Sequence, residues 1–350
     1  MTQIALASGF GSVRRFNAGI RTVYHRTPTQ IRRLARQKQK HPENEYLFRL
    51  RFRPPYAWQG MLAFLAARAI PGVEVVEGGC YRRSISLNRN HGYFEVSLDE
   101  ANHALTARVQ FGDPRSLFFI TERIRAMFDL NADWAAIIQS LRTDPVLAAG
   151  MKVDPGLRVP GCWDGFELAV RAILGQQVSV KGASTLAGRL VEAFGEPFCA
   201  PGGITHIFPT PQVLADAKVA GIGLPGARAE TICALARAVC SGRIRFEGIV
   251  DSADFLDRLC EIPGIGQWTA QYIAMRALGE PDAFPSGDLG LLRVLDLKTA
   301  HELERRAEDW RPWRAYAAMH LWNRAGERRF SAKQTDSRST GNELAMLVPA

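Results

Sequence analysis

The chain has 350 residues, of which 47% are hydrophobic and 23% charged, an ordinary composition for a globular protein of two or three domains. No apolar run reaches the length that a membrane-spanning helix needs. The net charge of +9 comes entirely from residues 1–42, which hold nine Lys or Arg and no Asp or Glu, so the rest of the chain is neutral. The overall charge therefore does not by itself indicate a nucleic-acid-binding body.

Residues 1–44 are predicted to form a basic, disordered arm. Three interpretations stay open for it. The arm adds nonspecific affinity for phosphates, directs the chain to an organelle as an Arg-rich transit peptide does, or is an inert extension.

The six cysteines show neither a Cys-x-x-Cys pair nor a His at zinc-finger spacing, which argues against a structural zinc site. Reduced cysteines and the lack of a secretory signal predict an intracellular protein, cytoplasmic and associated with a bacterial nucleoid.

A small mixed domain is predicted for residues 45–131. Its apolar pattern indicates a helix over 58–70 and strands over 73–76, 81–87, 93–98 and 104–111, separated by turn residues. Such an order favours an antiparallel sheet with helices on one face.

From residue 113 onward nearly every segment has helical periodicity, punctuated by Gly and Pro. Residues 132–330 are predicted to form a two-lobed all-α domain, and residues 331–350 a flexible tail. The fold class is therefore α+β. The predicted helices are 115–130, 133–141, 163–174, 179–194, 211–218, 228–241, 252–262, 267–277, 289–295, 300–310 and 313–324.

Residues 252–277 form the most informative segment, two amphipathic helices joined by a Pro-Gly-Ile-Gly turn. Gly264 and Gly266 are expected to permit close approach of an outside molecule and to take backbone angles that a Cβ would forbid, and the amides at the start of the second helix make an anion site. A short hairpin of this kind between two helices fits one phosphate of a nucleic acid backbone and reads no sequence. Gly264, Ile265, Gly266 and Thr269 are its candidate DNA contacts.

Asp288 precedes an apolar helix, so its carboxylate is either an N-cap or a catalytic group, and the two roles are compatible. Trp268 and Tyr272 share one face of the second hairpin helix, and Trp322 lies on the last helix. The three rings form either a core stripe or a pocket that stacks on a planar, cationic ligand.

The loop between helices 163–174 and 179–194 carries Gln176, Gln177 and Ser179. It is either an ordinary polar connection or a probe that fills a gap in a DNA duplex.

Five ordered segments together resemble the helix-hairpin-helix DNA glycosylase superfamily, and within it the alkylation-repair branch of DNA-3-methyladenine glycosylase II. They are the hairpin with its Trp and Tyr and the downstream Asp, Leu-Arg-Val-Pro-Gly-Cys-Trp-Asp-Gly-Phe-Glu (157–167), Val-Arg-Ala-Ile-Leu-Gly-Gln-Gln-Val-Ser-Val (170–180), Phe-Pro-Thr-Pro (208–211) and Trp-Arg-Pro-Trp-Arg-Ala-Tyr-Ala-Ala-Met-His-Leu-Trp (310–322). The resemblance extends over residues 46–324.

The resemblance implies that Asp288 is the catalytic carboxylate and that Trp268, Tyr272 and Trp322 surround a flipped base. Relatives that also cut the DNA strand carry Lys where this chain has Trp268, so no Schiff base is expected. Gln177 stands where the best-known member inserts a large apolar residue into the duplex.

The resemblance also implies a monovalent cation, Na⁺ or K⁺, held by the backbone carbonyls of Cys260, Ile262 and Ile265. The iron–sulfur cluster of other branches requires four C-terminal Cys, and the last Cys here is Cys260, so no such cluster is expected. No organic cofactor is expected either.

We therefore expect a monomeric, monofunctional glycosylase that flips and excises 3-methyladenine and related bases from duplex DNA and leaves an abasic site. Two alternatives stay open: a glycosylase for oxidised or mismatched bases, and a non-catalytic helix-hairpin-helix DNA-binding protein.

Overall fold

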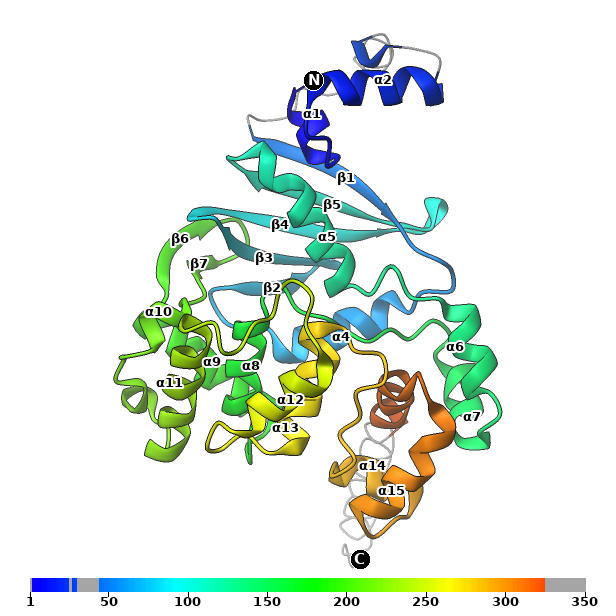
Figure 1. The fold of residues 1–350 in the computed structure, drawn as a ribbon, viewed down its shortest axis with the longest axis vertical. Helices are drawn as coiled ribbons and strands as arrows, with labels where there is room; N and C mark the ends of the chain where they lie inside the picture. Colours follow the sequence, from blue (N-terminus) through cyan, green and yellow to red (C-terminus); the bar gives the residue numbers. More distant parts are fainter. Residues whose placement is uncertain (1, 25–26, 30–43, 325–350) are drawn as a thin grey trace, which may run out of the picture.

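The computed structural model describes residues 2–24, 27–29 and 44–324. Its first domain is a five-stranded antiparallel sheet with strand order β1-β5-β4-β3-β2 (Figure 1). The strands are β1 (Glu45–Arg51), β2 (Glu74–Glu77), β3 (Cys80–Leu87), β4 (Asn90–Asp99) and β5 (Ala104–Phe111). Four of them match predicted strands, and β1 is an edge strand that the prediction missed.

Two helices, α4 (Trp58–Arg68) and α5 (Leu117–Met127), pack on one face of this sheet, as predicted. Successive side chains of a strand point to opposite faces, and alternate residues of β5 from Leu105 to Phe111 are buried under these helices. Side chains of α4 and α5 complete the same core, so the sheet holds α4 in a fixed position.

The structure differs from the expected disordered arm at residues 2–24, which form α1 (Thr2–Ala7) and α2 (Val13–Tyr24). The prediction weighed the charge of this segment and overlooked its small apolar core, in which Ala5 and Phe16 are buried. Residues 30–43 and the predicted flexible tail 331–350 lie outside the described residues.

Helices dominate the second domain, which has two lobes (Figure 1). One lobe contains α8 to α13 and the other contains α6, α7, α14, α15 and the helix of residues 314–324. The bounds are α6 (Trp134–Leu141), α7 (Pro145–Val153), α8 (Gly165–Leu174), α9 (Val180–Phe194), α10 (Pro211–Leu214), α11 (Gly226–Cys240), α12 (Ser252–Cys260), α13 (Gln267–Ile273), α14 (Leu289–Leu295) and α15 (Ala300–Ala307). Short 3₁₀ turns are η1 (Glu100–Asn102), η2 (Pro114–Ser116), η3 (Val219–Ile222) and η5 (Glu308–Trp310), and η4 (Ala274–Leu278) is a π-helical continuation of α13.

The expectation of an all-α second domain is wrong in one place, because β6 (Glu196–Ala200) and β7 (Ile204–Ile207) form a hairpin between α9 and α10. This hairpin lies against the first domain, where the Ser84 hydroxyl donates to the carbonyl of His206 at 2.6 Å. Among the described residues, no helix is long and apolar enough to cross a membrane.

A buried ion-pair network joins the sheet to α8 and fixes the two domains against each other. Arg83 on β3 donates to Glu167 on α8 at 2.6 Å, and Arg171 on α8 donates to Glu74 on β2 at 3.0 Å. Burial alone would raise the pKa of Glu74, but Arg171 and Arg83 outweigh it and lower that pKa. The network therefore holds α8, and with it the loop from α8 to α9, in a fixed position against the sheet.

Candidate active site

The hairpin between α12 and α13 has the geometry expected of a phosphate clamp. Gly264 adopts a φ of +92°, and a Cβ at this position would lie 2.2 Å from the Thr231 hydroxyl oxygen. Gly266 differs from expectation, because its φ of −95° suits any residue. A Cβ on Gly266 would meet open space, so this side of the turn is free for an outside molecule.

The two glutamines of the α8–α9 loop have different surroundings. The Gln176 amide donates to the carbonyl of Gly264 at 2.9 Å and to the hydroxyl of the buried Thr269 at 3.2 Å, so it braces the hairpin. Gln177 is exposed at the rim of the cleft, with a φ of +57° that presents it at the tip of the loop. Ser179 caps α9 through its hydroxyl, which accepts the Gly182 amide at 3.1 Å.

Asp288 is an N-cap, as one of its two predicted roles requires, and its second carboxylate oxygen bonds to a residue of the cleft. Its Oδ1 caps α14 by accepting the amides of Gly290 and Leu291 at 2.8 and 3.0 Å. Its Oδ2 accepts the indole Nε1–H of Trp268 at 3.0 Å. A carboxylate only accepts hydrogen bonds, so these three donors fix it rigidly at the edge of the cleft.

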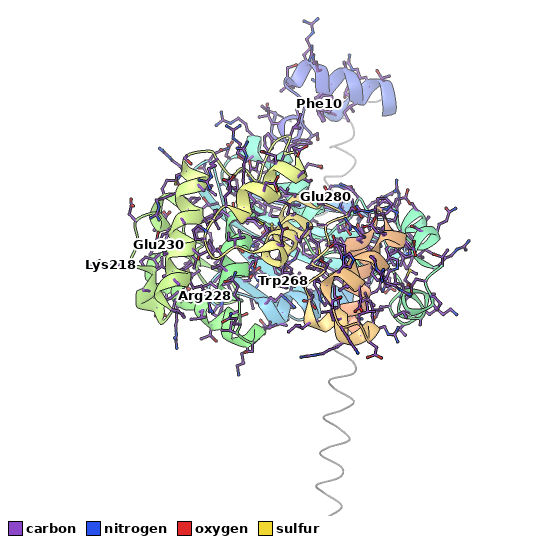
Figure 2. All side chains as sticks on the ribbon, turned by 60° about the horizontal axis from the view of Figure 1, so that its bottom comes forward. Phe10, Lys218, Arg228, Glu230, Trp268 and Glu280 are labelled. Atoms are coloured by element: carbon purple, nitrogen blue, oxygen red, sulfur yellow. The ribbon has the colours of Figure 1, made fainter. Side chains whose placement is uncertain are left out.

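The three predicted aromatic residues come together beside Asp288. Trp268 and Tyr272 are stacked, with ring centroids 5.4 Å apart and an interplanar angle of 6°. Trp322 meets Tyr272 edge-on at 6.2 Å. Figure 2 shows Trp268 near the middle of the molecule, between the two lobes.

Three further residues, which the sequence analysis missed, line the same cleft: Phe64, Arg68 and Arg276. The guanidinium groups of Arg68 and Arg276 both lie over the Phe64 ring, 3.8 and 4.8 Å from its centroid. Arg276 is buried and donates to the Tyr272 hydroxyl at 2.7 Å and to the carbonyls of Pro160 and Gly161.

A sequence signal existed for one of these residues. Arg276 follows Trp268 and Tyr272 at a spacing of four, which places all three on one helical face. Phe64 and Arg68 come from α4 in the first domain, and nothing local in the sequence links α4 to the hairpin.

The same two guanidinium groups change the acidity of the Tyr272 phenol. Burial alone would raise the pKa of Tyr272, but the positive charges of Arg276 and Arg68 outweigh it and lower that pKa. The inner wall of the cleft is therefore positively polarised, while Asp288 places a negative charge at its edge.

The cleft between the lobes has a volume of about 1280 Å³. Its walls come from α4, the α8–α9 loop, α13, the start of α14 and the helix of residues 314–324. The cleft suits a planar group that swings into it from a molecule held at the hairpin. The hairpin lies on the outside, the aromatic rings lie inside, and the Asp288 carboxylate lies between them.

The proposed cation ligands can be tested against the hydrogen bonds of the hairpin. The carbonyls of Pro263 and Gly264 accept side-chain bonds from Thr231 and Gln176. Within residues 44–324, no recorded hydrogen bond reaches the carbonyls of Cys260 and Ile265. The carbonyl of Ile262 accepts the Ile265 amide at 3.0 Å and retains a second lone pair. Each of the three predicted carbonyls therefore retains a lone pair for a cation, and their role as ligands stays a prediction.

Two family models match the chain, the AlkA N-terminal domain over residues 47–164 and the HhH-GPD superfamily base excision DNA repair protein over residues 170–311. The DNA-3-methyladenine glycosylase 2 of Escherichia coli is 36% identical over 284 residues, which cover 80% of this chain and 98% of that protein. A solved 3-methyladenine DNA-glycosylase from Archaeoglobus fulgidus shares the fold with a TM-score of 0.68, at 21% identity over 79% of this chain and 98% of that one.

A longer relative also matches, the probable bifunctional transcriptional activator/DNA repair enzyme AlkA of Mycobacterium tuberculosis. It is 41% identical over 328 residues, 91% of this chain, and the chain spans 66% of the length of that relative. The alignment covers more of the chain than residues 43–350 contain, so it includes at least some of residues 1–42.

Proposed function

Because the chain belongs to the family of DNA-3-methyladenine glycosylase 2, within the HhH-GPD superfamily, we propose that it excises alkylated bases from duplex DNA. It hydrolyses the N-glycosidic bond and leaves an abasic site in an intact strand. The observation that supports this most strongly is the Asp288 carboxylate, fixed by Trp268 at the edge of an aromatic cleft.

Cleavage of an N-glycosidic bond builds positive charge on the sugar at C1′. Asp288, anchored by two backbone amides and one indole N–H, is positioned to stabilise that charge or to orient the attacking water. Because the donors hold the carboxylate in place before substrate binds, little reorganisation is needed when the bond breaks.

The base enters the cleft after rotation out of the duplex. Trp268 and Trp322 offer ring surfaces on which a purine stacks. An N-alkylated purine carries positive charge and is a good leaving group, so its own lability contributes to selectivity and a strong general acid is not required.

Cutting of the DNA strand is not expected. The position that carries Lys in strand-cutting relatives is Trp268, whose indole is committed to Asp288. Among the described residues that line the cleft, the cations are Arg68, Arg171 and Arg276, and none is a Lys that could form a Schiff base. This argues against a bifunctional glycosylase for oxidised bases.

The hairpin holds one phosphate of the backbone through the amides at the start of α13. A monovalent cation on the carbonyls of Cys260, Ile262 and Ile265 would add positive charge at that point. Gln177, at the loop tip, occupies the space that the flipped base leaves, since its amide can hydrogen-bond where an apolar wedge would only stack.

The proposal is tested by chromatography of bases released from methylated duplex DNA, together with borohydride trapping on the same samples. We expect release of 3-methyladenine and no covalent protein–DNA adduct. A stable adduct would reveal an amine nucleophile and contradict the monofunctional mechanism, and no release of any methylated base would contradict the enzyme itself.

A further inference from the structure

The two N-terminal helices, α1 and α2, form a compact unit in which α1 is capped at its C-terminus and α2 at its N-terminus. Gly9, with a φ of +75°, ends α1 in a Schellman motif. The Gly9 amide donates to the carbonyl of Leu6, and the Phe10 amide donates to the carbonyl of Ala5, both at 3.0 Å. Ser12 begins α2, because its hydroxyl accepts the Arg15 amide at 3.3 Å. The turn is therefore defined at both ends.

Side-chain packing holds α1 and α2 against each other. The rings of Phe10 and Phe16 meet edge-on at 5.4 Å, and Ala5 and Phe16 are buried. A Cβ on Gly19 would lie 3.5 Å from the Phe10 ring, so the turn closes tightly over α2. In Figure 1 the two helices run in clearly different directions. Two short helices that cross over a Gly-containing turn have the form of a helix-turn-helix.

The exposed surface of α2 is strongly basic. Arg14, Arg15 and Arg21 are exposed, and within the described residues the structure records no ion pair for any of them. Residues 1–42 contain no Asp or Glu that could neutralise them. Arg14 and Arg15 lie in the first turn of α2, the part of a recognition helix that reaches base edges.

This unit is remote from the cleft. It rests on the first domain through η2 and α5, where a Cβ on Gly9 would lie 3.3 Å from the Phe118 ring. Figure 1 places α1 and α2 at the opposite end of the sheet from α13 and α14, and Figure 2 shows Phe10 and Trp268 well apart. A duplex in the cleft therefore leaves α2 free.

We propose that α1 and α2 form a helix-turn-helix that places the start of α2 in the major groove of an undamaged duplex, as a second DNA-binding site separate from the cleft. A helix of about 10–12 Å diameter fits a major groove about 12 Å wide.

The test measures simultaneous binding of two duplexes by the full chain. A biotinylated duplex with a tetrahydrofuran abasic site occupies the cleft on beads, and a labelled undamaged duplex of about two helical turns is then added. We expect the bead-bound protein to retain the labelled duplex. Arg14→Ala/Arg15→Ala should reduce retention at least about tenfold, because it removes two groove contacts.

The matched control is Arg142→Ala/Lys152→Ala, which removes the same charge from exposed positions in the lobe that contains α6 and α7. It should retain the labelled duplex as the wild type does. Ala favours helix, so α2 stays formed in the Arg variant, and that variant should release methylated bases at the wild-type rate. The proposal is overturned if wild type retains no labelled duplex, or if the Arg14→Ala/Arg15→Ala variant retains as much of it as wild type does. It is also overturned if both double variants lose the labelled duplex equally. Because base release is measured separately, these failures are distinct from a failure of the glycosylase function.

Discussion

The two carboxylate oxygens of Asp288 have different partners. The sequence analysis weighed an N-cap against a catalytic group; the structure confirms the cap through Oδ1, places Oδ2 on Trp268, and leaves the catalytic role as our proposal. Its place at a loop tip before an apolar helix was therefore predictable. The bond to Trp268 was not, because it joins residues twenty positions apart on different helices.

The aromatic residues alone suggest a pocket for a cationic base, and Arg68 changes this interpretation. The faces of Phe64 and Tyr272 already lie near internal guanidinium groups, so these rings have less attraction left for a cationic base. Arg68 also has five N–H donors, more than the carbonyl of Phe64 and the hydroxyl of Tyr272 can accept. Its position suits a base that carries a carbonyl oxygen.

Arg68→Met tests this view of the pocket. We expect the ratio of hypoxanthine release to 3-methyladenine release to fall about tenfold, because hypoxanthine is neutral and has a carbonyl acceptor, whereas 3-methyladenine is cationic and has none. Single-turnover release from two defined duplexes measures the ratio. Arg142→Met, which changes an exposed Arg far from the cleft, should leave it unchanged. An unchanged ratio in Arg68→Met would contradict the role of Arg68 in selecting bases.

At the scale of elements, local pattern predicted helices and strands well where their own residues determine them. The strands from residue 74 to 111 and the helix-hairpin-helix followed from periodicity and turn residues. The edge strand β1 and the β6–β7 hairpin were missed, because both are stabilised by partners distant in sequence or by packing on the other domain. Helices α1 and α2 were missed because charge was weighed above their small apolar core.

The two hairpin glycines allow structure and contact to be separated. Gly264→Ala should lower the free energy of unfolding by about 1–3 kcal/mol, because the new Cβ meets Thr231 and the φ of +92° is strained. Gly266→Ala should leave stability within about 0.5 kcal/mol and weaken DNA binding, because its Cβ points into open space where the phosphate approaches. Urea unfolding and fluorescence anisotropy measure the two effects, and equal destabilisation by both substitutions would contradict this division.

The whole molecule is held together partly by buried charge, and Asp129 is the clearest case. It lies at the end of α5 and accepts the Tyr316 hydroxyl at 2.8 Å and the Val159 amide at 3.2 Å, so it joins the first domain to the last helix. Burial raises the pKa of Asp129 to about 6, although the Tyr316 bond, Arg158 and the Val159 amide oppose the rise.

This shift has a defined consequence for stability. An unfolded Asp has a pKa of about 3.9, so the folded protein holds the proton more tightly, and the contribution of Asp129 to stability falls as the pH rises from about 4 to about 6. Asp129→Asn removes this dependence. Relative to wild type, the variant should gain about 2 kcal/mol of unfolding free energy at pH 7 compared with pH 4. Urea unfolding at both pH values gives this difference, and a constant difference would contradict the assignment.

The central claim is that Asp288 drives cleavage of the glycosidic bond, and single-turnover release of 3-methyladenine from methylated duplex DNA tests it most directly. Asn remains a good N-cap, so Asp288→Asn keeps α14 formed while removing the negative charge beside the sugar. Asp296→Asn is the matched control, since it makes the same change at the other end of α14, where the left-handed backbone tolerates Asn. We predict that Asp288→Asn lowers the rate at least about a hundredfold while Asp296→Asn releases base as wild type does. Release by Asp288→Asn at the wild-type rate would contradict the account.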